Sequence, residues 1–323
     1  MNTKLIPWSL AIFAARETPE VLARCVRAAI VACGKRQASL DVLINGNLAL
    51  AKKFAEMAKD LDGGGAKLRV WAIEAPDKAH TWNEYVYRIW DNAGTAFFID
   101  GYAQVRPDAL AAIDHRLMTT PDALGASGVP TSGRSAAALR EQMLRQGGIH
   151  GNLYAISEEG MQGIRAAGFK LPLGIYRTDP LIGSVLMFRL DPSNNTWDPR
   201  RIAVESSATW HVDGIEDLTL KNVKSHFKRI LRQAQGDLEN RAARDHLAVR
   251  GLPLTQMPKT VREMVLQWID AHPDEARSLY MKNPLRLHAA RRMRPPQDWS
   301  SAKRAPELLY GAPERQRVAA NLG

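Results

Sequence analysis

Residues 95–105 spell TAFFIDGYAQV, in which five positions of strand-like hydrophobicity run into a single aspartate, Asp100. The chain then turns on Asp100 and Gly101. A carboxylate at the tip of a buried strand could hold a metal or a sugar, and it could also belong to an ordinary Asp-Gly turn. The choice between these roles depends on what the neighbouring strands bring beside it.

Outward from this stretch, buried strand-like runs alternate with amphipathic helices. Thr18 is the expected cap of the first helix, and Pro19 takes its first position. The predicted strands are 8–15, 40–46, 67–74 and 95–100, with helices at 19–33, 48–61 and 81–94. A helix at 108–118, a strand at 123–130, a helix within 134–145, a strand at 151–157 and a helix at 158–169 follow. This order predicts an α/β fold with a mostly parallel, Rossmann-like sheet flanked by helices.

Polar residues follow each of the first four predicted strands. They are Glu17, Asn45, the loop 76–78 and Asp100. In open sheets of this kind, ligands bind outside the carboxyl ends of the strands. We therefore expect these polar groups to meet at one rim of the sheet and to form a binding site there.

Composition limits the class of protein. The chain has 323 residues and a formal net charge of +10, which favours anionic partners such as nucleotides, membrane surfaces or nucleic acids. Cys25 and Cys33 fall on one predicted helix, about 12 Å apart, which is too far for a disulfide. With no signal peptide and no spanning segment in the sequence, we expect a cytoplasmic protein, either free or peripheral on the inner face of the membrane.

Several common nucleotide and metal motifs are absent from the sequence. No Gly-x-Gly-x-x-Gly follows the first strand, and no phosphate loop ending in Gly-Lys-Ser or Gly-Lys-Thr occurs. No Cys and His cluster has zinc spacing. These absences disfavour a dinucleotide-binding fold, a P-loop NTPase and a structural zinc site.

From residue 5 to residue 215 the layout resembles glycosyltransferase family 2, enzymes with a GT-A fold that use nucleotide sugars. Glu17 in AIFAARET stands in the place of the polar loop after the family's first strand. By the same resemblance Asn45 contacts the base, and Lys78 and Asn83 in DKAHTWNEY complete the nucleotide pocket. In FFIDGYAQVRPDAL, Asp100 aligns with the first aspartate of the Asp-x-Asp motif.

The chain departs from the family at the second motif aspartate, where it has Tyr102. The resemblance implies a divalent cation, Mg²⁺ or Mn²⁺, with Asp100 and the late histidine His211 as ligands. A hard cation can use one carboxylate together with substrate phosphates, so the replacement leaves metal dependence open. Without a metal, Arg177 and Arg134 are candidates to stabilise the donor diphosphate.

The acceptor half of the family is matched by GIHGNLYAISEEGMQGIRAAGFKLPLGIYRTDPLIGSV, in which Asp179 takes the place of the catalytic base. Inversion at a sugar carbon needs one carboxylate to accept the proton of the acceptor hydroxyl. Asp179 also directly precedes Pro180, so it could cap a helix instead. The two roles are compatible.

The segment from 216 to 323 is predicted to be a basic, helical C-terminal extension beyond a GT-A domain of residues 1–215. Between Lys221 and Arg244, basic residues accompany an apolar strip. A basic amphipathic helix of this kind can lie on an anionic membrane, or the same strip can pack against the core. The resemblance to the family also implies an arginine on this helix near the donor diphosphate, for which Arg229 and Arg232 are candidates.

Together these features predict an inverting glycosyltransferase, with a place in polysaccharide biosynthesis. Its donor would be a nucleoside diphosphate sugar, preferably UDP-linked, and its acceptor a saccharide or a lipid-linked sugar. One alternative is a nucleotidyltransferase, although AARETPE makes a poor triphosphate loop. Another is a non-enzymatic protein that binds a membrane or nucleic acid. Nucleic acid is disfavoured, because Phe227 is the one aromatic residue among the basic residues between Lys221 and Arg244.

Overall fold

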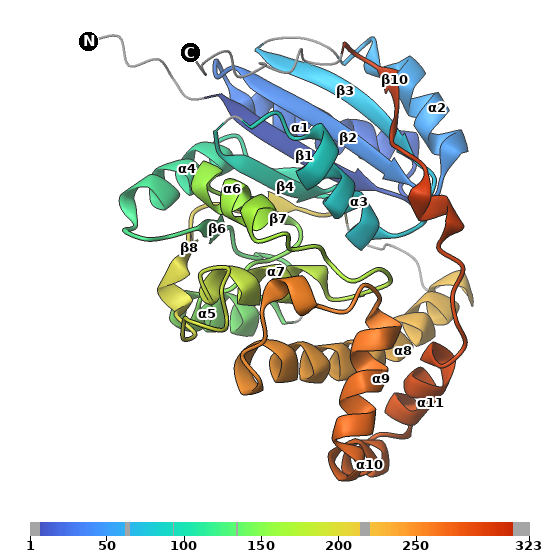
Figure 1. Ribbon diagram of the computed structural model, residues 1–323. Coiled ribbons are helices and arrows are strands. Elements are labelled where there is room, and N and C mark those ends of the chain that lie inside the picture. Colours follow the sequence, from blue (N-terminus) through green and yellow to red (C-terminus); the bar gives the residue numbers. More distant parts are fainter. Residues whose placement is uncertain (1–6, 62–64, 93, 134, 214–219, 313–323) are drawn as a thin grey trace, which may run out of the picture.

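An eight-stranded sheet forms the centre of the computed structural model (Figure 1), which describes residues 7–61, 65–92, 94–133, 135–213 and 220–312, without the side chains of residues 220–229. The strands follow the order β10-β3-β2-β1-β4-β7-β6-β8. Their bounds are β1 Trp8–Ala14, β2 Ala38–Asn45, β3 Ala66–Ile73, β4 Ala96–Asp100, β6 Gly125–Ser127, β7 Leu153–Ile156, β8 Ile202–Val204 and β10 Glu307–Tyr310. Strands β1 to β4 are parallel, and β7 is antiparallel to both of its neighbours. The predicted α/β class with a mostly parallel sheet is confirmed.

Both faces of the sheet are buried. Side chains alternate along each strand, so one strand contributes residues to the clusters on both faces. On β1, Leu10 and Ile12 join the cluster that contains the apolar sides of α1, α2 and α4, whereas Ala11 and Phe13 join the cluster on the opposite face. The helices have the bounds α1 Pro19–Cys33, α2 Leu48–Ala58, α3 Lys78–Glu84, α4 Ala109–Thr119, α5 Ala136–Gln146, α6 Glu158–Ala166 and α7 Thr178–Met187. Cys25 and Cys33 are buried in α1 as free thiols, as expected.

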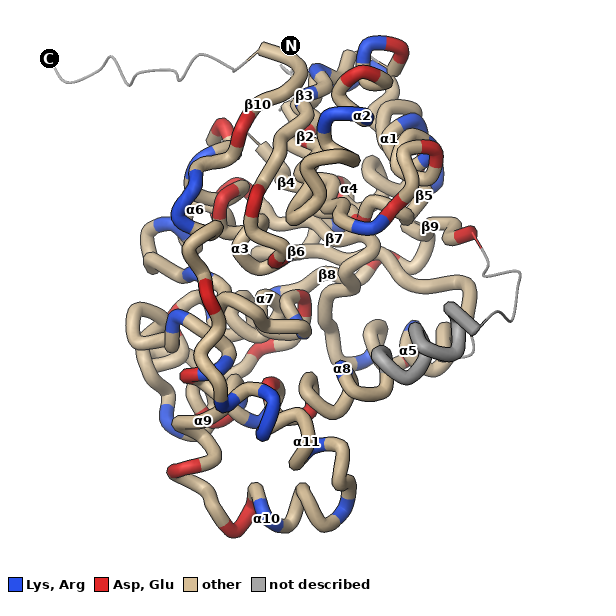
Figure 2. The backbone as a smooth tube through the Cα atoms, turned by 90° about the vertical axis from the view of Figure 1, so that its right-hand side faces the viewer, with Lys and Arg blue, Asp and Glu red and all other residues tan. Residues whose placement is uncertain are grey.

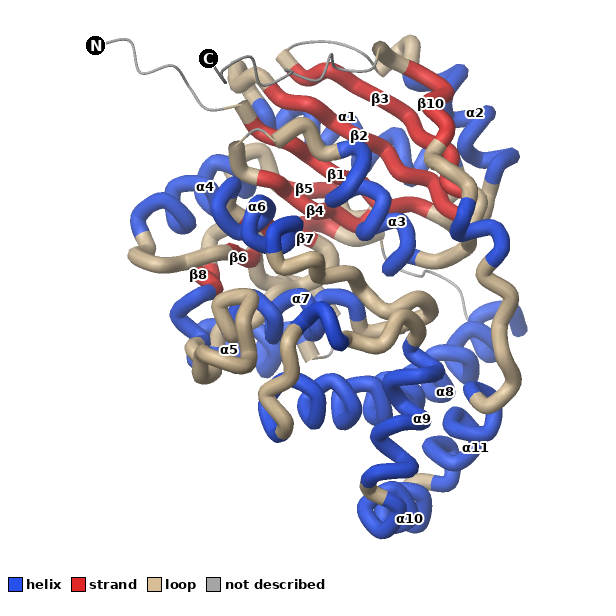
Figure 3. Tube along the Cα trace, in the orientation of Figure 1, coloured by secondary structure: helices blue, strands red, loops and turns tan. Residues whose placement is uncertain are grey.

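The C-terminal part of the described chain is mainly helical, as predicted. Its helices are α8 Leu220–Arg244, α9 Val261–Ala271, α10 Pro273–Lys282 and α11 Pro284–Met293. Figure 3 shows them grouped below the sheet, and the chain then returns along the sheet to add β10 antiparallel to β3. Leu238, Ala242 and Val265 share one hydrophobic cluster with residues of the sheet. The extension is therefore packed against the sheet domain, and the boundary near residue 215 remains a prediction.

Basic charge is concentrated in sequence after residue 215. This part holds 20 of the 44 Lys and Arg residues and 12 of the 34 Asp and Glu residues, so it carries +8 of the net charge of +10. Figure 2 shows Lys and Arg on α8, α9 and α11 as well as on the sheet domain. The membrane hypothesis depended on the basic segment from Lys221 to Arg244, of which residues 221–229 have their side chains outside the described residues. Among the described helices none is both long and apolar enough to cross a bilayer.

The third helix begins earlier than the sequence pattern predicted. Periodicity placed it at 81–94, but α3 starts at Lys78, because the side chain of Asp77 accepts a hydrogen bond from the backbone N–H of His80 and caps the helix. A π-helical turn follows at Tyr85–Ile89. The earlier start matters for the site, since it fixes Lys78 in the first turn of a helix rather than in a loop.

Candidate active site

A cleft with a volume of about 1530 Å³ opens at the carboxyl ends of β1 to β4. The polar residues predicted to meet there do so: Glu17, Asn45, Lys78 and Asp100 all line this cleft. The opposite wall comes from the loop 147–152, from the start of α7 with Asp179, and from Arg232 and Gln235 of α8. The parallel strand order therefore places the predicted nucleotide residues and the predicted base in one cleft.

Glu17 and Asn45 use their side chains to shape the rim of the cleft. The Oε2 atom of Glu17 accepts hydrogen bonds from the backbone N–H groups of Ala15 and Arg16, at 2.7 and 2.8 Å. The amide of Asn45, only 7% exposed, donates to the carbonyl of Ala14 at 3.0 Å and accepts from the N–H of Asp77 at 3.2 Å. Asn45 thus ties the end of β1 to the loop before α3.

Lys78 lies between the two aspartates. Its Nζ atom is 2.7 Å from Oδ1 of Asp100 and 3.7 Å from Oδ1 of Asp179. Burial opposes the charged form of Lys78, but the two carboxylates outweigh it and raise the lysine pKa well above its usual value. Burial and the nearby Asp179 raise the pKa of Asp100, with Lys78 acting in the opposite direction. The site therefore holds a permanent ammonium group between two acids.

Tyr102, which replaces the second motif aspartate, closes this network on the other side. Its hydroxyl donates to Oδ2 of Asp100 at 3.0 Å. With its amide oxygen accepting from Nε1 of Trp210 at 2.7 Å, Asn152 donates to the same Oδ2 at 3.2 Å and to the Tyr102 hydroxyl at 3.1 Å. Burial, followed by the charge of Asp100, raises the pKa of Tyr102, so its hydroxyl stays protonated as a donor.

Asp179 is the second residue of α7 and is not its cap. The residue before the helix is Arg177, and no side chain caps this end, so the interpretation of Asp179 as a helix cap is wrong. The hydroxyl of Thr178 donates to Oδ1 of Asp179 at 3.1 Å. The backbone of Gly151 approaches so closely that a Cβ atom there would lie 2.3 Å from Oδ2. The absence of a side chain at Gly151 therefore leaves the space beside the loop 147–152 that the Asp179 carboxylate occupies.

The start of α7 is tied to the C-terminal extension by a buried acid. Glu239 on α8 accepts hydrogen bonds from the backbone N–H groups of Tyr176 and Arg177, at 3.0 to 3.1 Å, and from the side chain of Gln235 at 2.7 Å. Burial raises the pKa of Glu239, and these hydrogen bonds act against that rise. The side chain of Arg177 lies across Gly236, where a Cβ atom would be 2.5 Å from Nε.

Asn83, predicted as a nucleotide contact, does not line the cleft. Its amide donates to the carbonyl of Leu171 and accepts from the N–H of the same residue, both at 2.9 Å. Five residues along a helix turn a side chain by about 140° relative to its starting direction. Since Lys78 faces the cleft, Asn83 faces the interior, where it joins α3 to the segment before α7.

His211, predicted as a metal ligand, also lies apart from this network. It pairs with Gln104 in the small sheet formed by β5 (Gln104–Val105) and β9 (Trp210–His211). Trp210 points inward and is 4% exposed, so its neighbour in the strand points outward. The His211 side chain is 68% exposed and lies 3.5 Å from Asp213.

The arrangement does not fit the predicted metal site. Both oxygens of Asp100 already accept hydrogen bonds, one of them from an ammonium group, and Tyr102 offers a protonated hydroxyl in place of a carboxylate. Within the described ranges, no three His, Cys, Asp or Glu side chains come together as ligands. A hard cation prefers carboxylate oxygens free to bind it, and here the positive charge at Asp100 is that of Lys78.

Sequence reasoning missed Tyr102 as a donor, and it missed Asn152, Gly151 and Glu239 altogether. Arg134, named as a diphosphate contact, lies outside the described residues, as does the side chain of Arg229. The three glycines around His150 in GGIHGN were the one local signal for a close backbone approach. Glu239 gave no signal, because its partners are 62 and 63 residues away in sequence.

The parallel β3-β2-β1-β4 order, the antiparallel β7 and the cleft at the strand ends define a GT-A type fold. Comparison with solved structures agrees. A mannosyltransferase from Pyrobaculum calidifontis, PcManGT, solved in complex with GDP-Man and Mn²⁺, is similar to this chain with a TM-score of 0.51 and 14% identity, covering 90% of this chain and 85% of that one. The resemblance inferred from the sequence is confirmed at the level of the fold.

Two further structures have lower TM-scores. Glucosyl-3-phosphoglycerate synthase from Mycobacterium tuberculosis, solved with Mn²⁺, UDP-Glc and glycerol 3-phosphate, gives 0.44 at 13% identity over 71% of this chain and 79% of that one. TarS from S. aureus, solved with UDP-GlcNAc, gives 0.46 at 9% identity over 89% and 80% of the two chains. No protein-family model matches the chain, and no curated protein matches it.

Proposed function

We propose that this protein is an inverting glycosyltransferase that moves a sugar from a nucleoside diphosphate donor, UDP-linked, to a saccharide or lipid-linked acceptor. The observation that carries the proposal is the position of Asp100 and Asp179 in one cleft, bridged by Lys78, at the ends of the parallel strands. A GT-A fold does not by itself specify a reaction, so the proposed function is drawn from these three residues.

In the proposed reaction the carboxylate of Asp179 accepts the proton of the acceptor hydroxyl. The hydroxyl oxygen forms a bond to the anomeric carbon, and the bond from that carbon to the diphosphate oxygen breaks on the opposite face. The bonding electrons leave with the nucleoside diphosphate. A positioned base of this kind contributes about 10²- to 10⁴-fold to the rate.

The negative charge of the leaving diphosphate is balanced in this proposal by side chains. Lys78 carries a permanent charge, and Arg16, Arg177 and Arg232 line the same cleft. Fixed cations in a partly buried site stabilise developing charge without reorganising water. Lys78 is therefore assigned to the diphosphate together with its role in orienting Asp100, and no step of the reaction is assigned to a metal.

The acceptor is placed on the Asp179 side of the cleft. Trp197 there is 50% exposed, and its ring packs edge-to-face against Phe188 with centroids 5.5 Å apart. A rigid, exposed indole ring is a suitable stacking surface for a sugar. Gln142 and Gln146 of α5 line the same wall and can form hydrogen bonds with hydroxyl groups.

The test is the variant Asp179→Asn, assayed by mass spectrometry against a panel of nucleotide sugars and acceptors. We expect transfer to be abolished while the binding of the nucleotide, measured by titration calorimetry, stays close to that of the wild type. Asp60→Asn, at an exposed acid in the turn after α2, is the matched control and should behave as wild type. Full transfer activity in Asp179→Asn would end the assignment.

A further inference from the structure

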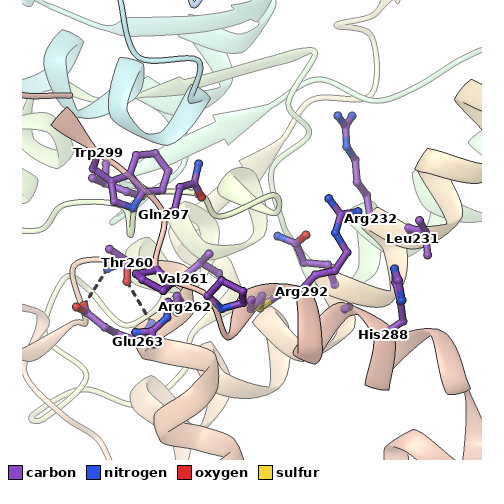
Figure 4. A pocket seen from close by; sticks show the side chains of 17 residues that line it. Leu231, Arg232, Thr260, Val261, Arg262, Glu263, His288, Arg292, Gln297 and Trp299 are labelled. Carbon is purple, nitrogen blue, oxygen red and sulfur yellow. Dashed lines mark hydrogen bonds between the residues drawn. The ribbon is translucent and has the colours of Figure 1, made fainter. Parts of the chain in front are cut away.

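A second cavity, with a volume of about 740 Å³, lies beside the cleft and within the C-terminal extension (Figure 4). Its walls come from α8, α9 and α11 and from the segment 295–299. This volume is within the range of about 300–1,000 Å³ that small-molecule sites have. Neither the proposed base nor the residues assigned to the donor, apart from Arg232, lie in it.

Three arginines from three different helices line this cavity: Arg232 of α8, Arg262 of α9 and Arg292 of α11. In Figure 4 the Arg232 and Arg292 side chains project to the same side of their helices, and His288 lies on the same wall. The guanidinium of Arg262 is anchored by a hydrogen bond from Nε to the carbonyl of Arg294, at 2.9 Å. Within the described part of the chain, its terminal N–H groups form no hydrogen bond.

Negative charge does not balance these groups. As far as the described side chains show, none of the three arginines forms an ion pair, and the one acidic residue of the lining, Glu263, is used in the capping box of α9, where it accepts from the N–H of Thr260. Burial, followed by the charge of Arg16, lowers the pKa of Arg232. Because Arg16 lines the cleft and not this cavity, the repulsion marks a position for an anion where the two spaces meet.

The cavity is joined to the cleft at Gly174, Arg232 and Gln235, which line both. Gly174 has a φ of +82°, and a Cβ atom there would lie 3.2 Å from the ring of Trp299 and from Val261. Its N–H donates to Oδ2 of Asp77 at 3.1 Å, on the cleft side. The absence of a side chain at this position keeps the two spaces next to each other.

We propose that this cavity binds a phosphorylated small molecule, such as a sugar phosphate, whose phosphate group is held by Arg232, Arg262 and Arg292. Guanidinium groups present paired N–H donors that match phosphate oxygens, and several arginines around one space suit a dianion. The surrounding extension adds a favourable long-range field, since it carries +8 of the net charge. The proposal does not depend on transferase activity, because it concerns binding alone.

The experiment is titration calorimetry of the full chain with glucose 6-phosphate and, separately, with inorganic phosphate, at about 0.15 M salt to suppress weak surface binding. The test variant is Arg262→Ala with Arg292→Ala. The control is Arg277→Ala with Arg291→Ala, which removes the same charge from α10 and α11 at exposed positions outside the cavity. Binding of UDP is measured in parallel as a check on the cleft, which neither pair of residues lines.

We expect saturable binding of glucose 6-phosphate by the wild type and by the control, and affinity reduced at least roughly tenfold in the test variant, with UDP binding unchanged. If the test variant is not folded, Arg292→Ala alone, at an exposed position, gives the same comparison. Equal loss in control and test variants would show only a general charge effect and would overturn the proposal. Absence of saturable binding of both glucose 6-phosphate and inorganic phosphate would overturn the assignment to phosphate.

Discussion

Glu239 offers the most direct test of how the extension controls the candidate active site. It lies on α8, is 1% exposed, and accepts hydrogen bonds from two backbone N–H groups that precede Asp179 by two and three residues. Its Oε1 atom also accepts a hydrogen bond from the side-chain amide of Gln235. We infer that Glu239 is a positioning residue that fixes the first turn of α7 and, through it, the carboxylate of Asp179.

The perturbation is Glu239→Gln, which keeps the size of the side chain but replaces one acceptor oxygen with a donor. Three donors then face a single oxygen with two lone pairs, so at least one buried donor loses its partner, at a cost of about 1–3 kcal/mol. The hydrogen bonds that remain then go to a neutral amide oxygen instead of a charged carboxylate, which weakens each of them by about 1 kcal/mol. Relief from burying a charge offsets part of this loss. The expected net destabilisation is about 2 kcal/mol, concentrated at residues 176–179.

The assay separates a positioning role from a general structural one. We expect the rate constant kcat to fall by about 100-fold, because a shift of about 1 Å in a reacting group has an effect of that size. The Kd for UDP should rise much less than kcat falls, because Glu17, Asn45, Lys78 and Asp100 lie on the sheet side of the cleft and Arg177 bonds to Glu239 through its backbone N–H. Glu56→Gln, an exposed acid on α2, is the control. A folded Glu239→Gln protein with wild-type kcat would refute the reasoning.

The other predictions concern the metal, the loop beside the base, and pH. Chelation with EDTA and addition of Mn²⁺ should leave the transfer rate unchanged, and a rate that disappears with EDTA and returns with Mn²⁺ would contradict the ammonium-based site. Gly151→Ala should lower kcat with little change in UDP binding, because its Cβ atom would lie 2.3 Å from Asp179, whereas Gly183→Ala, with neighbours no closer than 3.5 Å, should not. Burial lowers the pKa of His80 and of His246, so the unfolded chain binds more protons in acid. Unfolding by urea should therefore show stability falling as the pH drops below about 6.5, by up to about 1.4 kcal/mol per pH unit for each histidine, and a flat profile from pH 7 to pH 5 would exclude this.

Much of the fold followed from short-range patterns in the sequence. Stretches such as 8–14 and 96–100 are buried on both faces and are apolar throughout, apart from an occasional serine and the final aspartate, so their strand character and parallel pairing could be inferred. The rim of polar residues followed from the same order, because parallel strands deliver their carboxyl ends to one edge. Strand β10 could not be foreseen. It joins β3 across more than 230 residues, and nothing in its four residues specifies that edge.

The individual site residues were harder to predict, because their roles depend on direction rather than on position. Asn83 was correctly expected on a helix after the loop. Its side chain is rotated about the helix axis relative to that of Lys78, however, and therefore points into the interior. His211 was placed near the end of the sheet domain, yet its neighbour Trp210 takes the inward position. Both predictions used distance along the chain and ignored which face of a helix or strand the residue would occupy.

Tyr102 shows how one replacement can alter the chemistry expected of a whole motif. An aspartate at this position would put two carboxylates side by side, and their repulsion would favour a cation between them. The tyrosine instead donates a hydrogen bond to Asp100, and Lys78 supplies the positive charge from the first turn of α3. A site with a fixed ammonium group does not have to bind a metal ion, but the ammonium carries one positive charge where a divalent ion would carry two. The arginines of the cleft, Arg16 and Arg177 among them, are the groups within the described structure that can provide the remainder.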